Sequence, residues 1–139
     1  MTKRKFKILS WTWGLPMTLI GHAVAVVLRW LDYSPHKWGG CTYFTMGSNW
    51  GGLDLGPITL ICDDPGDYLL NHEFGHAIQN CYWGFLFPFV IAIPSAIRYW
   101  YRQAVVYFGF KEREELPGYY DIWFERQASE LGQKYIGKF

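Results

Sequence analysis

The chain has 139 residues, a length that suits one domain built around one hydrophobic core. Half of the residues are hydrophobic and a fifth are aromatic, which excludes intrinsic disorder, and 13 basic against 12 acidic residues exclude the charge excess typical of nucleic-acid binding. The three cysteines form no CxxC pair, and their odd number favours a reducing compartment over a disulfide framework. A single bridge between Cys41 and Cys62 is the alternative and would indicate an oxidising compartment.

The first 31 residues combine a basic start with a long apolar stretch. Residues 1–7 are expected to form a basic, mobile leader. Residues 8–28 contain no Asp, Glu, Lys or Arg over 21 positions, which is long enough for a membrane span with a cytoplasmic N-terminus. The same start fits a secretory signal with a cleavage site near Ala23-Val24-Ala25, an interpretation that we favour less.

Burial in a globular core explains the apolar stretch without a membrane. Gly14 and Pro16 divide it, and a helix accepts proline in its first turn, so a helix is predicted over 16–31. Small or polar residues recur along this helix at spacings of four, three and four, at Thr18, His22, Ala25 and Arg29. Such a stripe indicates that one side of the helix faces solvent or a site.

The middle of the chain predicts a small meander sheet followed by a helix. Turn-forming residues predict loops, and β-branched and aromatic runs predict strands. The loops are expected at 32–40 and 49–52, and the strands at 41–46, 53–55 and 57–62. The acidic segment 63–67, which contains Pro65, marks the start of a helix that should end at Gly84.

Residues 83–110 form a hydrophobic insertion after that helix. Within the overlapping stretch 81–97, 17 residues carry no charge, but Pro88 and Pro94 interrupt it. Two prolines fit helical pieces in a bent, re-entrant or surface segment better than a straight span. We therefore expect one compact domain that touches or dips into a membrane through 8–28 and 83–110. A fully soluble, cytoplasmic domain with both segments in its core is the alternative.

The segment His72-Glu73-Phe74-Gly75-His76 lies inside the helix predicted for the middle of the chain. Because a helix turns about 100° per residue, His72 and His76 share one face and can give two nitrogen ligands to one zinc ion. Glu73 is badly placed as a third ligand but can reach a water molecule at that position, so it is the expected general base. The five-residue pattern also occurs by chance on surface helices, but its apolar neighbours favour a site.

A catalytic zinc ion usually takes a third protein ligand and keeps one position open. The candidates in this sequence are His22, His36, Cys81, Glu125 and Glu130. Glu125 is favoured because Ala128 and Gly132 follow it on the same face, and small residues let two helices approach closely. An exposed glutamate paired with Lys or Arg is the alternative for Glu125.

The last helix, which carries Glu125, is predicted over 122–136 after a charged loop at 111–118. Asp121 is expected to cap its start, and Gly137 to mark its end. Tyr119 and Tyr120 come directly before this helix and should therefore lie near the metal. They are candidates for the group that stabilises an oxyanion, as is His22, and packing is the alternative role for all three.

His72-Glu73-x-x-His76, followed at a distance by Glu125-x-x-Ala128-Ser129, resembles the gluzincin metallopeptidases, several branches of which show ExxA followed by Asp. The order of elements resembles the minimal gluzincins over about residues 16–82 and 119–136. The resemblance implies an α+β zincin-like domain with an N-terminal helix, a short meander sheet, an active-site helix and a C-terminal glutamate helix. It also implies zinc ligands at His72, His76 and Glu125 with Glu73 as the base.

Two features depart from the family pattern. Ser129 stands where aspartate is common, and that aspartate often orients a zinc-binding histidine. A serine could accept the same hydrogen bond more weakly. The insertion 83–110 is absent from the smallest members. We expect a zinc-dependent hydrolase, most simply a peptidase that acts on peptides or proteins. The alternative is a membrane-associated protein that binds a partner and whose zinc is structural or absent.

Overall fold

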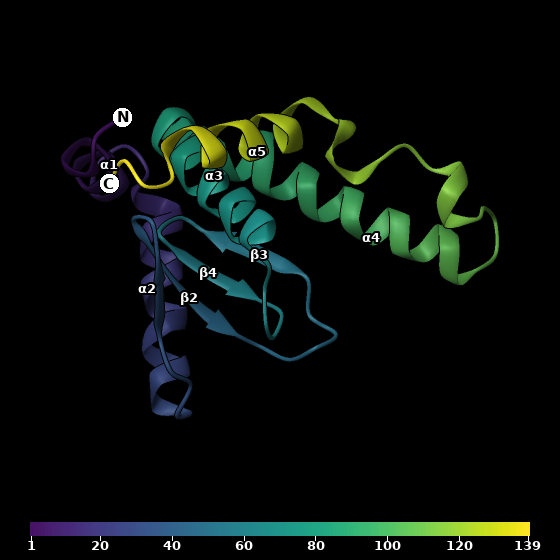
Figure 1. Ribbon diagram of the computed structural model, residues 1–139, viewed down its shortest axis with the longest axis horizontal. Helices are drawn as coiled ribbons and strands as arrows, with labels where there is room; N and C mark the ends of the chain where they lie inside the picture. The colour runs from purple at the N-terminus through teal and green to yellow at the C-terminus, as the bar shows by residue number, and fades with distance from the viewer.

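The computed structural model describes residues 1–139 and confirms the α+β class. A four-stranded sheet lies between α2 on one face and α3 on the other, and α5 runs along α3 (Figure 1). The α-helices are α1 (Lys3–Trp11), α2 (Leu15–Trp30), α3 (Asp67–Trp83), α4 (Ile93–Tyr107) and α5 (Trp123–Tyr135). The strands are β1 (His36–Trp38), β2 (Cys41–Thr45), β3 (Gly52–Leu55) and β4 (Ile58–Ile61).

The N-terminal segment is helical, so the prediction of a mobile leader at residues 1–7 was wrong. The Thr2 side chain accepts a hydrogen bond from the Lys5 N–H at 3.2 Å and caps α1. Phe6 is buried and packs on Phe139, which brings the two ends of the chain together (Figure 1). One buried aromatic ring therefore anchors a helix whose sequence resembles a basic tail.

The helix expected over 16–31 is confirmed as α2, with Pro16 in its first turn. Its stripe of small and polar residues is divided, because Arg29 is exposed and His22 half-buried whereas the small residues face the interior, contrary to the prediction. Thr18 and Ala25 are buried. A side chain at Gly21 would collide with the carbonyl of Leu55, so small residues are what allow α2 to lie close to the sheet. Several large apolar residues of α2, Leu19, Ile20, Val26, Val27 and Trp30, are exposed.

The sheet has the order β1-β2-β4-β3 and is mixed, whereas a meander was predicted. β3 and β4 form an antiparallel hairpin, but β4 pairs in parallel with β2 and so lies between β2 and β3. All four residues of β4 are buried, as expected of a central strand, because each has partners on both sides and helices over both faces. Residues 36–38, predicted as part of a loop, form the edge strand β1.

The helix that carries the HExxH segment begins at Asp67 and ends before Gly84, as predicted. Gly66, rather than an acidic residue, occupies the N-cap position. The proposed cap at Asp121 was also wrong, because its carboxylate accepts the N–H of Gly118 and Ile122 precedes α5. α5 still lies where the sequence predicted it.

The insertion consists of helical pieces, as predicted: the 3-10 segment η1 (Gly84–Leu86), the π-helical segment η2 (Pro88–Ala92) and α4. The chain bends by 115° between the run that ends at Leu86 and the run that begins at Pro88. By length and hydropathy no single helix could cross a membrane. Two bent pairs reach the necessary values only together, α1 with α2 and α3–η1 with η2–α4.

Two further 3-10 turns, η3 (Arg113–Glu115) and η4 (Tyr119–Asp121), connect α4 to α5. The three cysteines are free, so the alternative of a Cys41–Cys62 bridge is not realised. Cys41 and Cys81 are both buried in the apolar cluster that joins α1, β2 and α3. Their role there is packing.

Candidate metal centre

Three buried side chains from two helices meet at one point between α3 and α5. His72 and His76 of α3 direct their Nε2 atoms towards Oε2 of Glu125 on α5, at 3.0 Å and 3.1 Å. The two Nε2 atoms lie 3.2 Å apart. The ligand atoms of this trio all lie within 4.8 Å of one another, so the group could hold a metal ion. The structure thus brings together the three residues that the sequence predicted as ligands.

The other four ligand candidates lie elsewhere. His22 stacks on Trp11, and His36 is exposed and stacks on Tyr43. The Cys81 thiol lies 3.5 Å from the Ser10 hydroxyl in the apolar cluster, and Glu130 is exposed on α5. None of the four is part of the metal-ligand group, so Glu125 is the only one of the five that joins the two histidines.

Glycines let the two helices approach closely enough for a shared ion. A side chain at Gly75 would collide with the Ala128 carbonyl, and one at Gly132 would collide with the Asn71 carbonyl. The small residues expected to permit this approach, Ala128 and Gly132, are both buried at the contact. Gly75 supplies the matching space on α3, inside the HExxH segment itself.

Each histidine is oriented by a hydrogen bond at its second ring nitrogen. Nδ1 of His72 lies 2.9 Å from Oγ of Ser129, which is the contact predicted for the serine in place of the family's aspartate. Nδ1 of His76 lies 2.7 Å from Oε1 of Gln79. With Nδ1 protonated and donating, each Nε2 lone pair is free to bind a metal.

Gln79 was missed in the sequence, although it follows His76 by three residues on the same helix. It is fully buried, and its amide nitrogen donates to the Phe124 carbonyl at 2.8 Å and to Oε1 of Gln127 at 2.9 Å. These bonds fix the amide so that its oxygen faces His76. The sequence contains one indication of this role for Gln79. It is a polar residue at a position of the helix where burial would favour an apolar one.

Glu125 is fully buried and has no Lys or Arg partner. Burial raises the pKa of its carboxyl group, but hydrogen bonds to His72 and His76 lower the pKa by more. The resulting pKa is far below the ordinary range for a glutamate. Its second oxygen, Oε1, accepts a hydrogen bond from Ser95 of α4 at 2.5 Å. Ser95 is the second residue that sequence analysis missed, because nothing in an apolar stretch marked one serine as a contact.

The donor set fits zinc. Bonds of about 2.0–2.1 Å in a tetrahedral arrangement separate the ligand atoms by roughly 3.3–3.4 Å. The three separations here are 3.0, 3.1 and 3.2 Å, within a few tenths of an ångström of those values. Two imidazoles and one carboxylate are also a ligand combination used by catalytic zinc sites. Two imidazoles and a carboxylate that converge with no Lys or Arg beside them could hold a metal cation.

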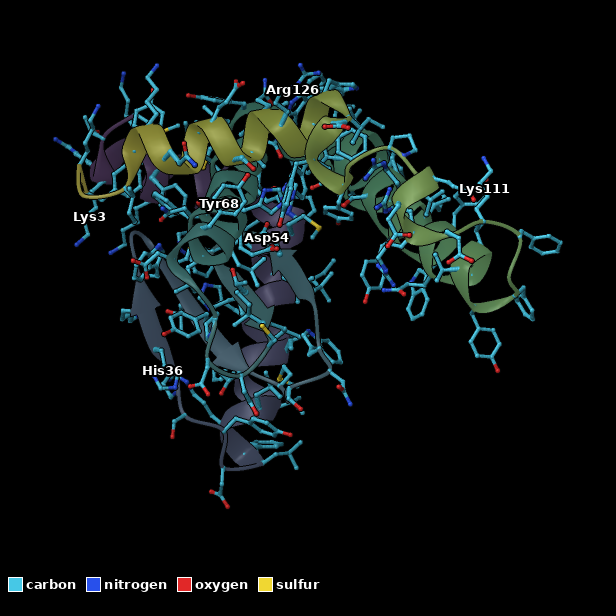
Figure 2. The ribbon with its side chains drawn as sticks, turned by 45° about the vertical axis from the view of Figure 1, so that its right-hand side comes forward. Lys3, His36, Asp54, Tyr68, Lys111 and Arg126 are labelled. Atoms are coloured by element: carbon cyan, nitrogen blue, oxygen red, sulfur yellow. The ribbon has the colours of Figure 1, made fainter.

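A cleft of about 370 Å³ opens beside the metal-ligand group. Residues 49–54, which lead into and form β3, make one wall, and residues of η2 and α4 make the other. Glu73 and His76 reach the cleft from α3, and Tyr119 lines it from η4. Asp54, labelled in Figure 2, lies in the β3 wall. Its carboxylate accepts the Gly56 N–H at 3.1 Å, which indicates a role in the β3–β4 turn.

Glu73 has the surroundings of a proton acceptor. Burial raises the pKa of its carboxyl group, while the neighbouring His76 and His72 lower it less strongly. A side chain at Gly52 would collide with the Glu73 carboxylate, so the glycine keeps the space in front of it open. Glu73 does not belong to the ligand trio, in agreement with its predicted separate role.

The two tyrosines predicted near the metal differ in position. Tyr120 sets the edge of its ring against His72, with centroids 4.8 Å apart, and does not line the cleft. Tyr119 does line the cleft, and Arg98 holds it by donating to its carbonyl and lying over its ring. Burial and the charge of Glu125 raise the pKa of the Tyr119 hydroxyl, which therefore stays protonated and able to donate.

Comparisons with known proteins give no relative: no family model matches the chain, no curated protein matches its sequence, and no solved structure matches its fold. A function for this chain is therefore inferred from its residues and their geometry.

Proposed function

We propose that the chain is a zinc-dependent hydrolase, most simply a peptidase. The observation that carries this proposal is the convergence of His72, His76 and Glu125 at the end of a cleft into which Glu73 also points. A structural zinc ion would be enclosed by four protein ligands, whereas this group supplies three and lies next to an accessible cleft. The arrangement matches the one that the gluzincin resemblance implies.

Zinc, when bound, would polarise the scissile carbonyl and lower the pKa of a water molecule. The carboxylate of Glu73 would accept a proton from the attacking water and then pass that proton to the leaving amine. This second transfer returns the carboxylate to its starting state. The raised pKa of Glu73 suits a group that must both take and release a proton. The neutral Tyr119 hydroxyl would donate a hydrogen bond to the carbonyl oxygen as negative charge develops on it.

The cleft supports a peptide as substrate. β3 is an edge strand, paired on one side only with β4, and residues 49–54 line the cleft along this edge. An extended peptide could add itself to this edge through main-chain hydrogen bonds. The opposite wall is apolar and aromatic, with Phe87, Ile91, Tyr99 and Trp100, and would favour a hydrophobic side chain on the substrate.

Replacing Glu73 with Gln tests the proposal. The variant should keep stoichiometric zinc, because Glu73 is not a ligand, and should lose about 10²- to 10⁴-fold in hydrolysis rate on a peptide library. Glu130→Gln, which makes the same change at an exposed position on α5, is the matched control and should leave the rate unchanged. A Glu73→Gln protein that cleaves as fast as the parent would refute the assignment. A parent that holds zinc and cleaves nothing would favour the partner-binding alternative.

A further inference from the structure

α2 is apolar on two opposite faces, and only one of them packs on the sheet. The outer face carries Leu19, Val26 and Trp30, whose exposed fractions are 53%, 52% and 82%. At about 100° per residue these positions fall within a narrow sector of the helix, and Ala23 and Val27 lie beside them. The exposed Arg29 borders this sector on the other side. A helix that is apolar all round is typical of a large core or a membrane, and this domain provides no core on that side.

A second exposed apolar stripe runs along the insertion. Phe89, Ile97 and Phe108 recur near helical spacing and are 70%, 63% and 68% exposed. The charged residues of α4 face the other way, since Arg98 and Arg102 donate hydrogen bonds to carbonyls of residues 117–119. The insertion therefore turns its charges towards the protein and its aromatic residues towards the outside. Figure 2 shows ring side chains projecting at the end of the molecule where Lys111 lies.

The two stripes meet where the α1–α2 junction touches η1. The rings of Trp13 and Phe85 have centroids 5.5 Å apart, and both residues are exposed. The indole N–H of Trp13 donates to the Tyr82 carbonyl at 3.0 Å. We call the outer face of α2, this junction and the stripe from Phe85 to Phe110 the apolar surface. It contains exposed large apolar residues from two segments of the chain, whereas such residues on a soluble monomer are usually scattered singly.

Within the segments that form the apolar surface the charged residues are all basic, and the nearest acidic residues are Asp32 and Glu112, directly after the two segments. All 12 acidic residues lie outside segments 1–31 and 82–111. Eight of the 13 basic residues lie inside them, of which Arg98 and Arg102 face the protein: Lys3, Arg4, Lys5, Lys7, Arg29, Arg98, Arg102 and Lys111. The four at the start of the chain are exposed on α1. Basic residues next to an apolar surface complement a bilayer with anionic headgroups, whereas a second copy of this chain would bring like charges together.

We propose that the apolar surface binds a lipid bilayer that contains anionic lipids. The outer face of α2 and the stripe of the insertion enter the hydrocarbon, and the basic residues of α1 lie at the headgroups. The insertion contributes to both the cleft and the apolar surface, but Leu19, Val26, Trp30, Phe89, Ile97 and Phe108 neither line the cleft nor belong to the metal-ligand group, so the membrane proposal can fail while the proposed hydrolase activity holds.

Flotation with vesicles tests the proposal on the full chain, diluted from mild detergent. The vesicles contain phosphatidylcholine alone, or roughly three parts of it to one part phosphatidylserine. Two triple variants each remove one stripe: Leu19→Ser with Val26→Ser and Trp30→Ser, and Phe89→Ser with Ile97→Ser and Phe108→Ser. Because each replaces three large apolar groups, each should lower the partition coefficient at least about hundredfold on both kinds of vesicle. Circular dichroism and zinc content, unchanged from the parent, show that the fold is intact.

The headgroup contribution is tested separately. Lys3→Ser with Lys5→Ser should weaken binding about thirtyfold on the anionic vesicles only, since each of the two basic residues near such a surface contributes about 1 kcal/mol. Lys37→Ser with Arg126→Ser removes the same charge outside segments 1–31 and 82–111 and should change binding little. A parent that stays unbound overturns the proposal. So does a parent dimer, measured by light scattering, that the triple variants dissociate, because the occupant would then be a second copy.

Discussion

Two regions of this molecule reverse the usual placement of polar and apolar side chains. Between α3 and α5, two histidines, two glutamates and a glutamine are buried. Along α2 and α4, large apolar and aromatic side chains are exposed. In the first region each histidine nitrogen has a partner, so the buried polar groups are compensated within the chain, and the trio could also hold a metal ion. In the second, the apolar groups keep much of their surface exposed, and the proposal above assigns that surface to a lipid bilayer.

The largest expected effect comes from separating the two helices that carry the ligands. Gly75→Ala places a methyl group against the Ala128 carbonyl, so α3 and α5 must move apart. We expect the free energy of unfolding to fall by about 3 kcal/mol and zinc binding to be lost. Urea denaturation and metal analysis measure both. Gly66→Ala, where an added Cβ would meet nothing within 4 Å, is the control and should cost less than about 1 kcal/mol. Equal losses for the two variants would contradict the close-approach argument.

A smaller effect is expected from the groups that orient the histidines. Ser129→Ala removes the hydrogen-bond partner of His72 Nδ1, and Gln79→Ala removes that of His76 Nδ1. Each variant should bind zinc about 10- to 100-fold more weakly than the parent, because the affected histidine loses its fixed tautomer and orientation. Competition with a chelator measures this affinity. Ser34→Ala, on an exposed loop, should leave the affinity unchanged. If the Ser129 and Gln79 variants bind zinc like the parent, the orienting role is wrong.

The smallest expected effect is a change of zinc affinity with pH. Burial lowers the pKa of His76, but its hydrogen bond to Glu125 and the charges of Glu73 and Glu125 raise it more, to about 9 in the metal-free protein. At neutral pH the imidazole therefore carries a proton that zinc must displace. Affinity should rise up to about tenfold per pH unit between pH 6.5 and 8.5, with close to one proton released per ion from this residue. Calorimetry in buffers of different ionisation enthalpy measures that release, and an affinity that is flat over this range would exclude it.

The three residues that meet between α3 and α5 could be predicted from patterns within single helices. His72 and His76 share a face by arithmetic, and Ala128 and Gly132 marked the helix that could come close enough to bring Glu125. Ser129 was found through the family pattern, since its aspartate equivalent has the same task.

What the sequence did not predict depends on contacts between distant segments. The parallel pairing of β2 with β4 needs information on which strand inserts between which, and a run of apolar residues does not carry it. Residues 1–7 were predicted to be a mobile leader because four of the seven are basic. The only buried side chain that anchors this segment is that of Phe6, and its burial depends on distant residues. The stripe on α2 was assigned to the wrong side because small residues serve close packing as well as they serve an open face. Ser95 gave no signal until α4 had been placed beside Glu125.

The bond from Ser95 to Glu125 has a consequence for how this domain could be shortened. A shorter chain that joined α3 directly to α5 would keep all three ligand side chains. It would lose the hydroxyl that holds Oε1 of Glu125, and with it the aromatic wall of the cleft. The insertion therefore contributes directly to the candidate metal centre, through a hydrogen bond to Glu125 and through one wall of the cleft. Trimming it is expected to leave a metal binder with a loosened carboxylate and one side of its cleft missing.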